Sequence, residues 1–368
     1  MDKREYVIFG AGRIGEKVLY RIWQSTEISC FWDNNKMGEV LGYRIERPSY
    51  KTNVFIIVAL QQYFEVRSQL ISMGYQEFID FIPYQIYERK MAVAYGNCHM
   101  DAVKHYLESN KMFSKEYGFY PFPMIQDISL TSDFDYMNVL SHADLFLHQS
   151  VRENNMYSKE QSSKYMLTAV PTSCKVLALP NLYGMPKCFF PQLNTKFKRL
   201  DAVFYYYFFD SNIVEWLKEG KHPKEIANKI SNGGIYSKEY ILEMWETFRE
   251  KLLFREYEWD IKISDYIFEN YKTEKLFCDT NHITAKTARE IAKRVLKFLK
   301  YDCIDINAPL IGMDWMEAFI YPDVKDALGL TFEEKIIRRS CVDAFGDCDY
   351  EEYIERICTY TLLNMKYL

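Results

Sequence analysis

The sequence lacks any hydrophobic run that is long enough to cross a membrane. Its longest apolar stretches, such as residues 54–60, fall well short of the roughly 20 residues that a transmembrane helix needs. The first residues contain only a short apolar run and no small-residue cleavage site, unlike a secretory signal peptide. We therefore expect a soluble, cytoplasmic protein without a transmembrane segment.

The sequence also lacks an excess of positive charge and the usual metal-binding motifs. Its formal net charge is -5 at pH 7, which argues against nucleic acid as a partner. The nine cysteines are odd in number and contain no CxxC pair, so neither a disulfide framework nor a zinc ribbon is indicated. No HExxH, P-loop or DxD-like metal cluster stands out either, so we predict no metal site.

What the sequence does contain is ample material for a hydrophobic core. Of its 368 residues, 48% are hydrophobic and 26% are charged, which is typical of a globular chain long enough for two domains. Short apolar runs alternate with helical patterns, and this order predicts α/β architecture with parallel sheets. We predict two α/β units in series, with a small domain over residues 1–89 and a larger one over residues 90–368.

The two predicted units differ in their helical content. The larger domain has its core at about residues 91–300, with a helical insertion, and ends in a helical tail at 330–368. The clearest helices are expected at residues 63–74, 99–109 and 284–300. The predicted strands cover residues 6–10, 28–33, 53–60 and 77–82 in the first unit and 91–96, 117–123, 143–149 and 174–181 in the second.

A glycine-rich turn follows the first predicted strand. Gly10, Gly12 and Gly15 match the pattern GxGxxG, and Asp33 ends the next strand 18 residues after Gly15. Such glycines let the backbone approach a diphosphate at a helix N-terminus, and an acidic residue in this position can bind a ribose. The unit resembles the small Rossmann-like modules of bacterial polysaccharide enzymes, and it predicts a nucleotide or nucleotide-sugar site. A tight turn in a shortened Rossmann-like unit is the structural alternative.

One cysteine occupies a position that favours chemistry. Cys98 follows the predicted strand at 91–96 and stands where a helix begins, in the sequence Gly96-Asn97-Cys98. The free N–H groups and the partial positive charge of a helix N-terminus favour a thiolate and can hold an oxyanion. The sequence therefore predicts that Cys98 is a nucleophile, and the alternative is an inert, buried thiol.

A base for this nucleophile must come from elsewhere in the chain. His282 closes the sequence DTNH at 279–282, so one short loop supplies an imidazole and the carboxylate that fixes its tautomer. His148 with Gln149, and also Asn181, follow other predicted strands. Because ligands bind beyond the carboxyl ends of parallel strands, these side chains are candidates as well. Strand-end hydrogen bonding or a simple turn is the alternative for each of them.

These sequence blocks together resemble a known enzyme plan. The SGNH hydrolases and acyltransferases, which have a three-layer α/β fold, share this plan. Their nucleophile lies in a turn of small residues after a strand, and a late DxxH loop precedes a helix that packs on the sheet. The blocks GNC, HQ and NH in this order resemble the WcbI family of polysaccharide biosynthesis enzymes. The resemblance covers roughly residues 91–300, and His99 departs from the family's usual GNCQ.

The resemblance implies a coenzyme A-dependent O-acetyltransferase that acts on a sugar of a bacterial surface polysaccharide, such as capsule or lipopolysaccharide, or on its precursor. Cys98 would accept the acyl group, His282 would be the general base, Asp279 would orient it, and Asn181 would donate to the oxyanion. The donor substrate would be acetyl-coenzyme A and the acceptor a carbohydrate. Three further residues are assigned to the coenzyme A site, namely Asn97, His148 and Gln149.

The sequence leaves several alternatives open. Cys98 could carry the acetyl group as a thioester, or His282 could activate the sugar hydroxyl for direct transfer. The same site could serve a carbohydrate esterase or deacetylase. A nucleotide-binding protein without chemistry would instead have Cys98 buried and out of reach of His282. The aromatic run at 202–210 could line a groove for the sugar acceptor, or it could be a buried segment. The lysines within 196–199 could contact the coenzyme A phosphates, or they could belong to a solvated turn.

Overall fold

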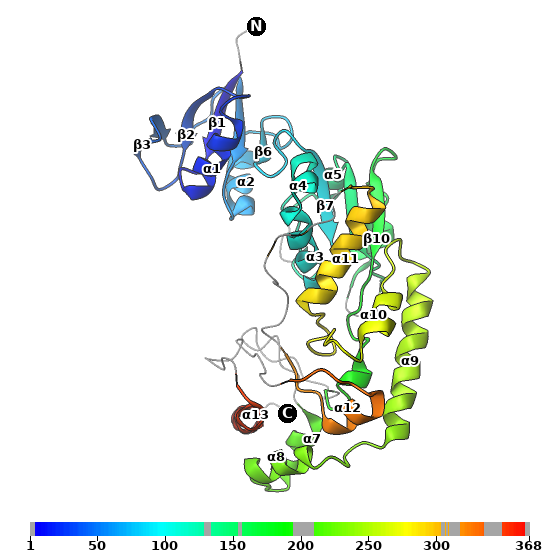
Figure 1. The fold of residues 1–368 in the computed structure, drawn as a ribbon. Coiled ribbons are helices and arrows are strands. Elements are labelled where there is room, and N and C mark those ends of the chain that lie inside the picture. The colour runs from blue at the N-terminus through cyan, green and yellow to red at the C-terminus, as the bar shows by residue number, and fades with distance from the viewer. Residues whose placement is uncertain are drawn as a thin grey trace. The chain divides into compact units, whose positions relative to one another are not determined.

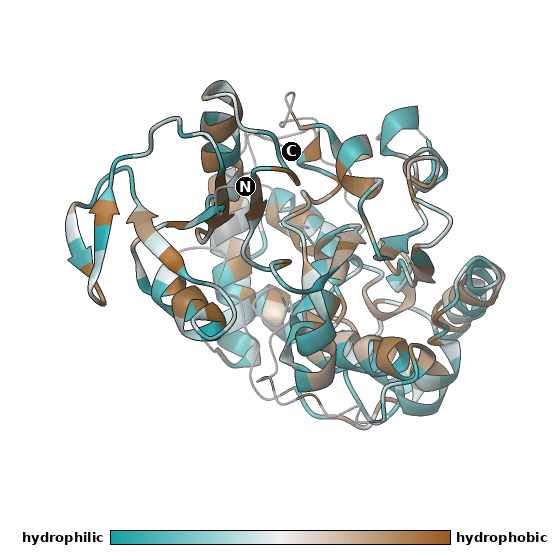
Figure 2. Cartoon of the chain, turned by 90° about the horizontal axis from the view of Figure 1, so that it is seen from above, coloured by the Kyte–Doolittle hydropathy of each residue, from teal (hydrophilic) through white to brown (hydrophobic). Residues whose placement is uncertain are grey.

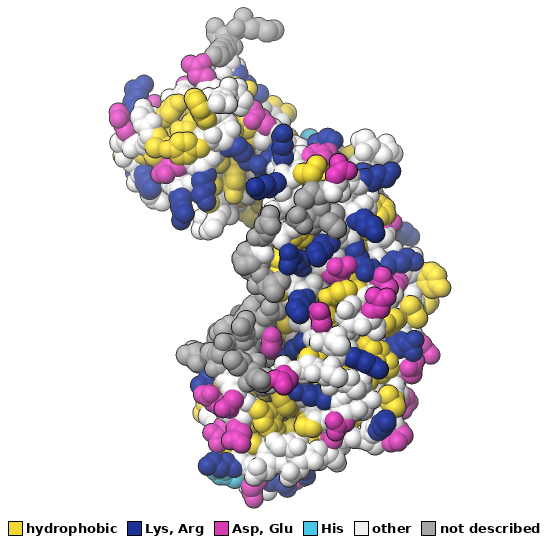
Figure 3. All heavy atoms as spheres, viewed as in Figure 1, with side chains coloured by type: hydrophobic (Ala, Val, Ile, Leu, Met, Phe, Trp, Pro, Cys, Tyr) yellow, Lys and Arg dark blue, Asp and Glu magenta, His cyan; other side chains and the backbone are white. Residues whose placement is uncertain are grey.

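The computed structural model describes most of the chain. The described residues are 4–128, 134–153, 157–193, 210–302, 306, 308, 317–334 and 348–364. Residues 196–199 and 202–209, for which contacts with substrates are predicted above, lie outside them. No helix within the described ranges is both long and apolar enough to cross a membrane. The face drawn in Figure 3 carries Lys and Arg side chains interspersed with Asp and Glu.

The chain divides into two compact units, which we describe one at a time. The first is formed by Met1–Tyr95 with Lys111–Val176, and the second by Gly96–Asn110 with Leu177–Leu368. The described residues form two β-sheets and many helices, so the predicted α/β class with two α/β parts is confirmed (Figure 1). The division into domains after residue 89 stays a prediction.

The first unit opens with a six-stranded sheet. Its strands are β1 (Glu5–Phe9), β2 (Ile28–Trp32), β3 (Gly38–Val40), β4 (Tyr43–Glu46), β5 (Val54–Val58) and β6 (Phe81–Pro83). They lie in the order β3-β4-β2-β1-β5-β6. Every pairing is parallel except that of β3 with β4, and the connecting helices are α1 (Arg13–Ile22) and α2 (Tyr63–Ser72). The predicted parallel sheet is therefore present.

The antiparallel β3–β4 hairpin has no counterpart among the predicted strands. Leu41 and Gly42 join the two strands with positive φ angles of 49° and 81°, the geometry of a tight two-residue turn. β3 is short and largely exposed. It therefore shows none of the apolar alternation by which a half-buried strand is recognised.

The strands of this sheet bury side chains on both faces. Val7 and Phe9 of β1 belong to a core that continues into Met91, Val93 and Phe146 of the same unit. Ile8, which points the other way, joins a second core with residues of α1. Burial on both faces explains why these strands read as nearly continuous apolar runs (brown in Figure 2).

The second sheet of the described residues has four strands. Its strands are β7 (Lys90–Tyr95), β8 (Tyr117–Phe119), β9 (Leu145–Gln149) and β10 (Lys175–Leu179), in the order β10-β9-β7-β8. β7 pairs in parallel with both β8 and β9. Three short helices lie between these strands in sequence: α4 (Lys111–Glu116), α5 (Tyr136–Leu140) and α6 (Ser163–Met166).

The second unit is mostly helical. Its helices are α3 (Cys98–Ser109), α7 (Ser211–Lys218), α8 (Pro223–Ser231), α9 (Lys238–Glu256), α10 (Ser264–Asn270), α11 (Ala285–Phe298), α12 (Pro322–Leu328) and α13 (Tyr350–Asn364). Helix α3 packs against α11, and the two lie side by side in Figure 1. Part of the predicted helical tail, at 335–347 and 365–368, lies outside the described residues.

Helix α11 is the element that the sequence indicates most clearly. Ala288, Ile291, Ala292 and Val295 are all at most 1% exposed, as their helical spacing predicts. Phe298, which the pattern also assigns to the buried stripe, is 48% exposed instead. It is the last residue of the helix, where the chain turns away through Lys300 in a left-handed conformation.

Candidate active site

The first part of the site is the start of helix α3. After β7, Asn97 caps the helix, because its side-chain oxygen accepts a hydrogen bond from the backbone N–H of His99 at 3.0 Å. Cys98 is therefore the first helical residue, beside backbone N–H groups that have no partner within the helix. Its side chain is partly exposed, so it can meet a ligand.

Cys98 differs in this respect from the other described cysteines, all six of which are buried. Burial raises the pKa of Cys30 and Cys174 to about 11 and that of Cys358 to about 12. Thiols of this kind stay protonated at neutral pH and act as small apolar residues. Within the described part of the chain, Cys98 is thus the thiol placed for chemistry.

The second part of the site is the loop that precedes α11. An antiparallel bridge between Phe277 and Ile283 closes this loop. Asp279 organises it, since one carboxylate oxygen accepts from the backbone N–H groups of Asn281 and His282 at 2.6 and 2.9 Å. The other oxygen lies 2.8 Å from Nδ1 of His282. This contact fixes the imidazole ring and leaves its Nε2 for another partner.

The Cys98 side chain lies close enough to the imidazole of His282 to shift its pKa. Burial of His282 disfavours its charged form, but the hydrogen bonds and negative charges of Asp279 and Cys98 outweigh burial and raise its pKa to about 10. At neutral pH the ring is therefore an imidazolium that faces the sulfur. The structure brings together three of the predicted catalytic residues, Cys98, Asp279 and His282.

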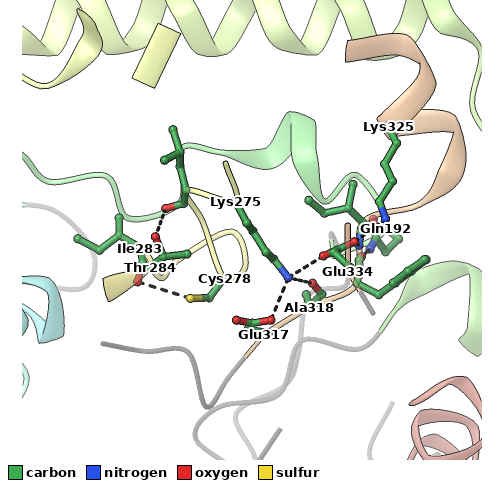
Figure 4. Close-up of polar contacts among 12 residues, drawn as sticks. Gln192, Lys275, Cys278, Ile283, Thr284, Glu317, Ala318, Lys325 and Glu334 are labelled. Carbon is green, nitrogen blue, oxygen red and sulfur yellow. Dashed lines mark hydrogen bonds and ion pairs between the residues drawn. The ribbon is translucent and has the colours of Figure 1, made fainter. Parts of the chain in front are cut away.

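A buried ion network supports the base of this loop (Figure 4). The Lys275 ammonium lies 2.7 Å from Glu334 and 3.2 Å from Glu317, and it donates to the carbonyl of Ala318 at 3.1 Å. Burial opposes the charge of Lys275, but the two carboxylates outweigh it and raise its pKa. The N–H of Ala318 in turn donates to the carbonyl of Cys278 at 2.6 Å. The network therefore ties a neighbour of Asp279 to the rest of the unit.

Asn181 lies beside the helix cap. Its side-chain oxygen accepts from the amide of Asn97 at 3.4 Å and from the backbone N–H of Tyr183 at 3.3 Å. Its backbone carbonyl accepts from Arg255 at 3.1 Å. These contacts engage the oxygen of the side-chain amide and leave its NH₂ group to donate elsewhere. The predicted residues Asn97 and Asn181 are thus in contact with each other.

His99 is a member of the site whose role the sequence does not predict. Its side chain is 1% exposed, and its Nε2 lies 2.5 Å from the backbone carbonyl of Asn281. Its ring centre is 6.4 Å from that of His282. Burial, and then the positive charge of His282, lower the pKa of His99 to about 4. The only feature of the sequence that drew attention to His99 is that it replaces the glutamine of the family's usual GNCQ.

His148 and Gln149 lie in the first unit, at the end of β9. Both are buried, the ring of His148 stacks on Phe146 at 5.3 Å, and the Gln149 carbonyl accepts from the hydroxyl of Ser163 at 2.7 Å. These contacts fit the strand-end alternative. The assignment of His148 and Gln149 to a coenzyme A site stays a prediction.

The glycine turn has a structural explanation for two of its glycines. Gly10 has a φ of +117°, and a Cβ atom at Gly15 would lie 1.9 Å from the carbonyl oxygen of Gly10. At Gly12, by contrast, an added Cβ would meet nothing within 4 Å. The Asp33 carboxylate accepts from the N–H of Ala11 at 2.9 Å and so holds the turn itself. Nucleotide binding by this turn stays a prediction.

Comparison with known proteins gives two likenesses. A model of the family described as polysaccharide biosynthesis enzyme WcbI matches residues 91–302, more than half of the chain. A solved structure of WcbI, described as a novel polysaccharide biosynthesis enzyme, is 20% identical with a TM-score of 0.58, over 75% of this chain and 90% of that one. It is described as the native protein without a disulfide bond between coenzyme A and a cysteine. No curated protein matches the chain.

Proposed function

The chain belongs to the WcbI family of polysaccharide biosynthesis enzymes, and from this premise we propose that it is a coenzyme A-dependent O-acetyltransferase of a surface-polysaccharide sugar or its precursor. The observation that carries the proposal is the contact of Cys98 with His282, whose ring is held by Asp279. The solved WcbI protein, which is described with reference to coenzyme A and a cysteine, supports a coenzyme A thioester as the donor.

In the proposed reaction, the Cys98 thiolate attacks the carbonyl carbon of acetyl-coenzyme A. A bond forms between Cys98 sulfur and the acetyl group, the thioester bond to coenzyme A breaks, and the His282 imidazolium protonates the leaving thiolate. The neutral His282 then takes the proton of a sugar hydroxyl, whose oxygen attacks the acetyl-Cys98 thioester. This second step forms the sugar ester and restores the thiolate and the imidazolium.

The charge state of His282 favours this covalent route over direct transfer. Direct transfer needs a neutral imidazole in the resting enzyme, so that His282 can take a proton from the sugar at once. A pKa of about 10 keeps the ring protonated at neutral pH. An imidazolium beside a cysteine instead primes the thiolate for attack.

Two groups are proposed to hold the oxyanion of the tetrahedral intermediate. One is the backbone N–H of Cys98, the first residue of α3, and the other is the NH₂ group of Asn181, which is oriented by the contacts of its oxygen with Asn97 and Tyr183. Removal of one such donor typically costs about 3–4 kcal/mol of transition-state stabilisation. In this proposal Asn97 acts on the site through Asn181 as well as through the helix cap.

The first experiment tests the ligand. Thermal unfolding of the full chain is measured with coenzyme A, acetyl-coenzyme A, NAD and nucleotide sugars. We expect coenzyme A and its acetyl ester to raise the midpoint temperature, because a ligand that binds only the folded state stabilises it. No shift with either coenzyme A compound would contradict the proposal, and a shift with NAD or nucleotide sugars alone would favour the alternative of a nucleotide-binding protein.

The second experiment tests the reaction. Release of coenzyme A from acetyl-coenzyme A is followed with and without oligosaccharide acceptors, in the wild type, in Cys98→Ala and in Cys174→Ser as the matched thiol control. We expect acceptor-dependent release that is lost in Cys98→Ala and kept in Cys174→Ser. Release at the same rate without any acceptor would identify a hydrolase instead.

A further inference from the structure

We propose that His99 is a positioning residue, which holds the loop of Asp279 and His282 against the start of α3 through its hydrogen bond to the Asn281 carbonyl. The inference rests on the proposed function, because it concerns the contact of Cys98 with His282. It gives a role to a buried histidine that the reaction itself does not use.

The hydrogen bond defines the tautomer of His99. A carbonyl oxygen can only accept, so the proton must be on Nε2, which lies 2.5 Å from it. A neutral imidazole has one N–H group, and its Nδ1 is then without a proton. This Nδ1 is buried and has no hydrogen-bond partner among the described residues. The single described hydrogen bond of the ring is therefore the one to the loop.

The hydrogen bond between His99 and Asn281 joins the direct neighbours of the two reacting residues. His99 directly follows Cys98, and Asn281 directly precedes His282. Both ends are fixed, since the N–H of His99 donates to the cap Asn97 and the N–H of Asn281 donates to Asp279. One bond between the two neighbours thus sets how the thiol and the imidazole face each other.

The lack of charge on His99 matters as much as its hydrogen bond. The charged or titratable groups that face it are His282, at 6.4 Å between ring centres, and Asp279. A second imidazolium here would repel that of His282 and weaken its pairing with Cys98. Burial and the charge of His282 lower the pKa of His99 to about 4, which keeps it neutral. A neutral amide donor should therefore be able to replace it, and an apolar side chain should not.

The tautomer is tested first, in the wild-type protein. Long-range proton–nitrogen NMR spectra of the chain with labelled histidines are recorded from pH 5 to pH 8, and His99 is assigned by the signal that disappears in His99→Gln. We expect a neutral ring with its proton on Nε2 at every pH. A proton on Nδ1, or titration near pH 6.5, would overturn the inference whether or not any variant folds.

The role is tested by comparing His99→Gln with His99→Leu. The rate at which iodoacetamide alkylates Cys98 is measured at pH 7 by peptide mapping, which needs no acyl donor. We expect His99→Leu to lower this rate by about tenfold or more, because the thiolate loses its imidazolium. His99→Gln, which keeps a neutral donor, should stay within about twofold of the wild type.

The two proposals can fail separately. If His99→Leu lowers thermal stability but leaves the alkylation of Cys98 and the titration of His282 unchanged, His99 is only structural and the inference is overturned. This result would leave acetyl transfer untouched. If no acetyl transfer is found while His99→Leu still slows alkylation, the positioning role stands and the proposed function fails.

Discussion

At the scale of single residues, the site depends on the charge of His282. Its pKa is about 10 in the folded chain and near 6.5 in an unfolded one, because Asp279 and Cys98 surround it only after folding. The His282 ring therefore holds a proton in the folded state that it has lost in the unfolded state between these two values. This difference affects stability as well as chemistry.

We accordingly predict that His282 stabilises the fold most below about pH 6.5 and that this contribution is lost as the pH rises through 10. In this window the contribution of His282 to the free energy of unfolding should fall by up to about 1.4 kcal/mol per pH unit. Urea unfolding of the wild type and of His282→Gln at pH 6, 8 and 10 measures the effect as their difference. Asp279→Asn should reduce this pH-dependent difference in stability. Equal pH profiles for the wild type and His282→Gln would contradict the pairing of His282 with Asp279 and Cys98.

Asn181 gives a second prediction at this scale. Asn181→Ala should lower kcat by about 10²- to 10³-fold, as is typical when an oxyanion donor is lost. The KM for acetyl-coenzyme A should change little, since the donor acts on the transition state. Steady-state kinetics checks both values, with Asn228→Ala, an exposed position on α8, as the matched control. A higher KM with an unchanged kcat would mean that Asn181 binds substrate instead.

At the scale of elements, the start of α3 combines stability with function. Asn97 caps the helix with its oxygen and contacts Asn181 with its NH₂ group. These two roles belong to different atoms of one side chain. A substitution that keeps the acceptor but removes the amide can therefore separate them.

Asn97→Ala should lose the cap and cost about 0.5–2 kcal/mol of stability, together with activity. Asn97→Ser should keep the cap and the stability and lose activity alone, because Ser is a good cap residue but lacks the amide that orients Asn181. Chemical unfolding and turnover of both variants check the prediction. Full activity in Asn97→Ser would show that the contact with Asn181 has no functional role.

Elements with strong apolar patterns were predictable from the sequence. The buried stripe of α11 and the central strands of the first sheet lie where their periodicity indicates them. The β3–β4 hairpin could not be predicted from the sequence, because an exposed edge strand needs no apolar residues. The bond of His99 to Asn281 was also beyond the sequence, since it depends on how α3 is rotated against a loop 182 residues away.

At the scale of the whole molecule, the sequence predicted the family and the α/β class, but it left the glycine turn of the first unit undecided. Gly10 and Gly15 are required by the packing of the backbone itself. They therefore give no evidence for a ligand. Gly12 is different, because the space beside it is open.

Gly12 allows the nucleotide prediction to be tested without disturbing the fold. Gly12→Ala should change the stability of the free protein little, because the residue is extended and an added Cβ meets nothing within 4 Å. If a nucleotide diphosphate binds here, the substitution should reduce the rise in midpoint temperature that the nucleotide produces in the wild type. The same rise in both proteins would rule out a nucleotide site at this turn.

In the proposed reaction, Cys98 carries the acetyl group between the donor and the sugar. The most direct test is the mass of the Cys98 peptide after the full chain has been mixed with acetyl-coenzyme A and quenched in acid, without any acceptor. We expect one acetyl group on Cys98, which is lost again when a competent sugar is added. An unmodified Cys98 in a protein that still transfers acetyl groups to the sugar would contradict it.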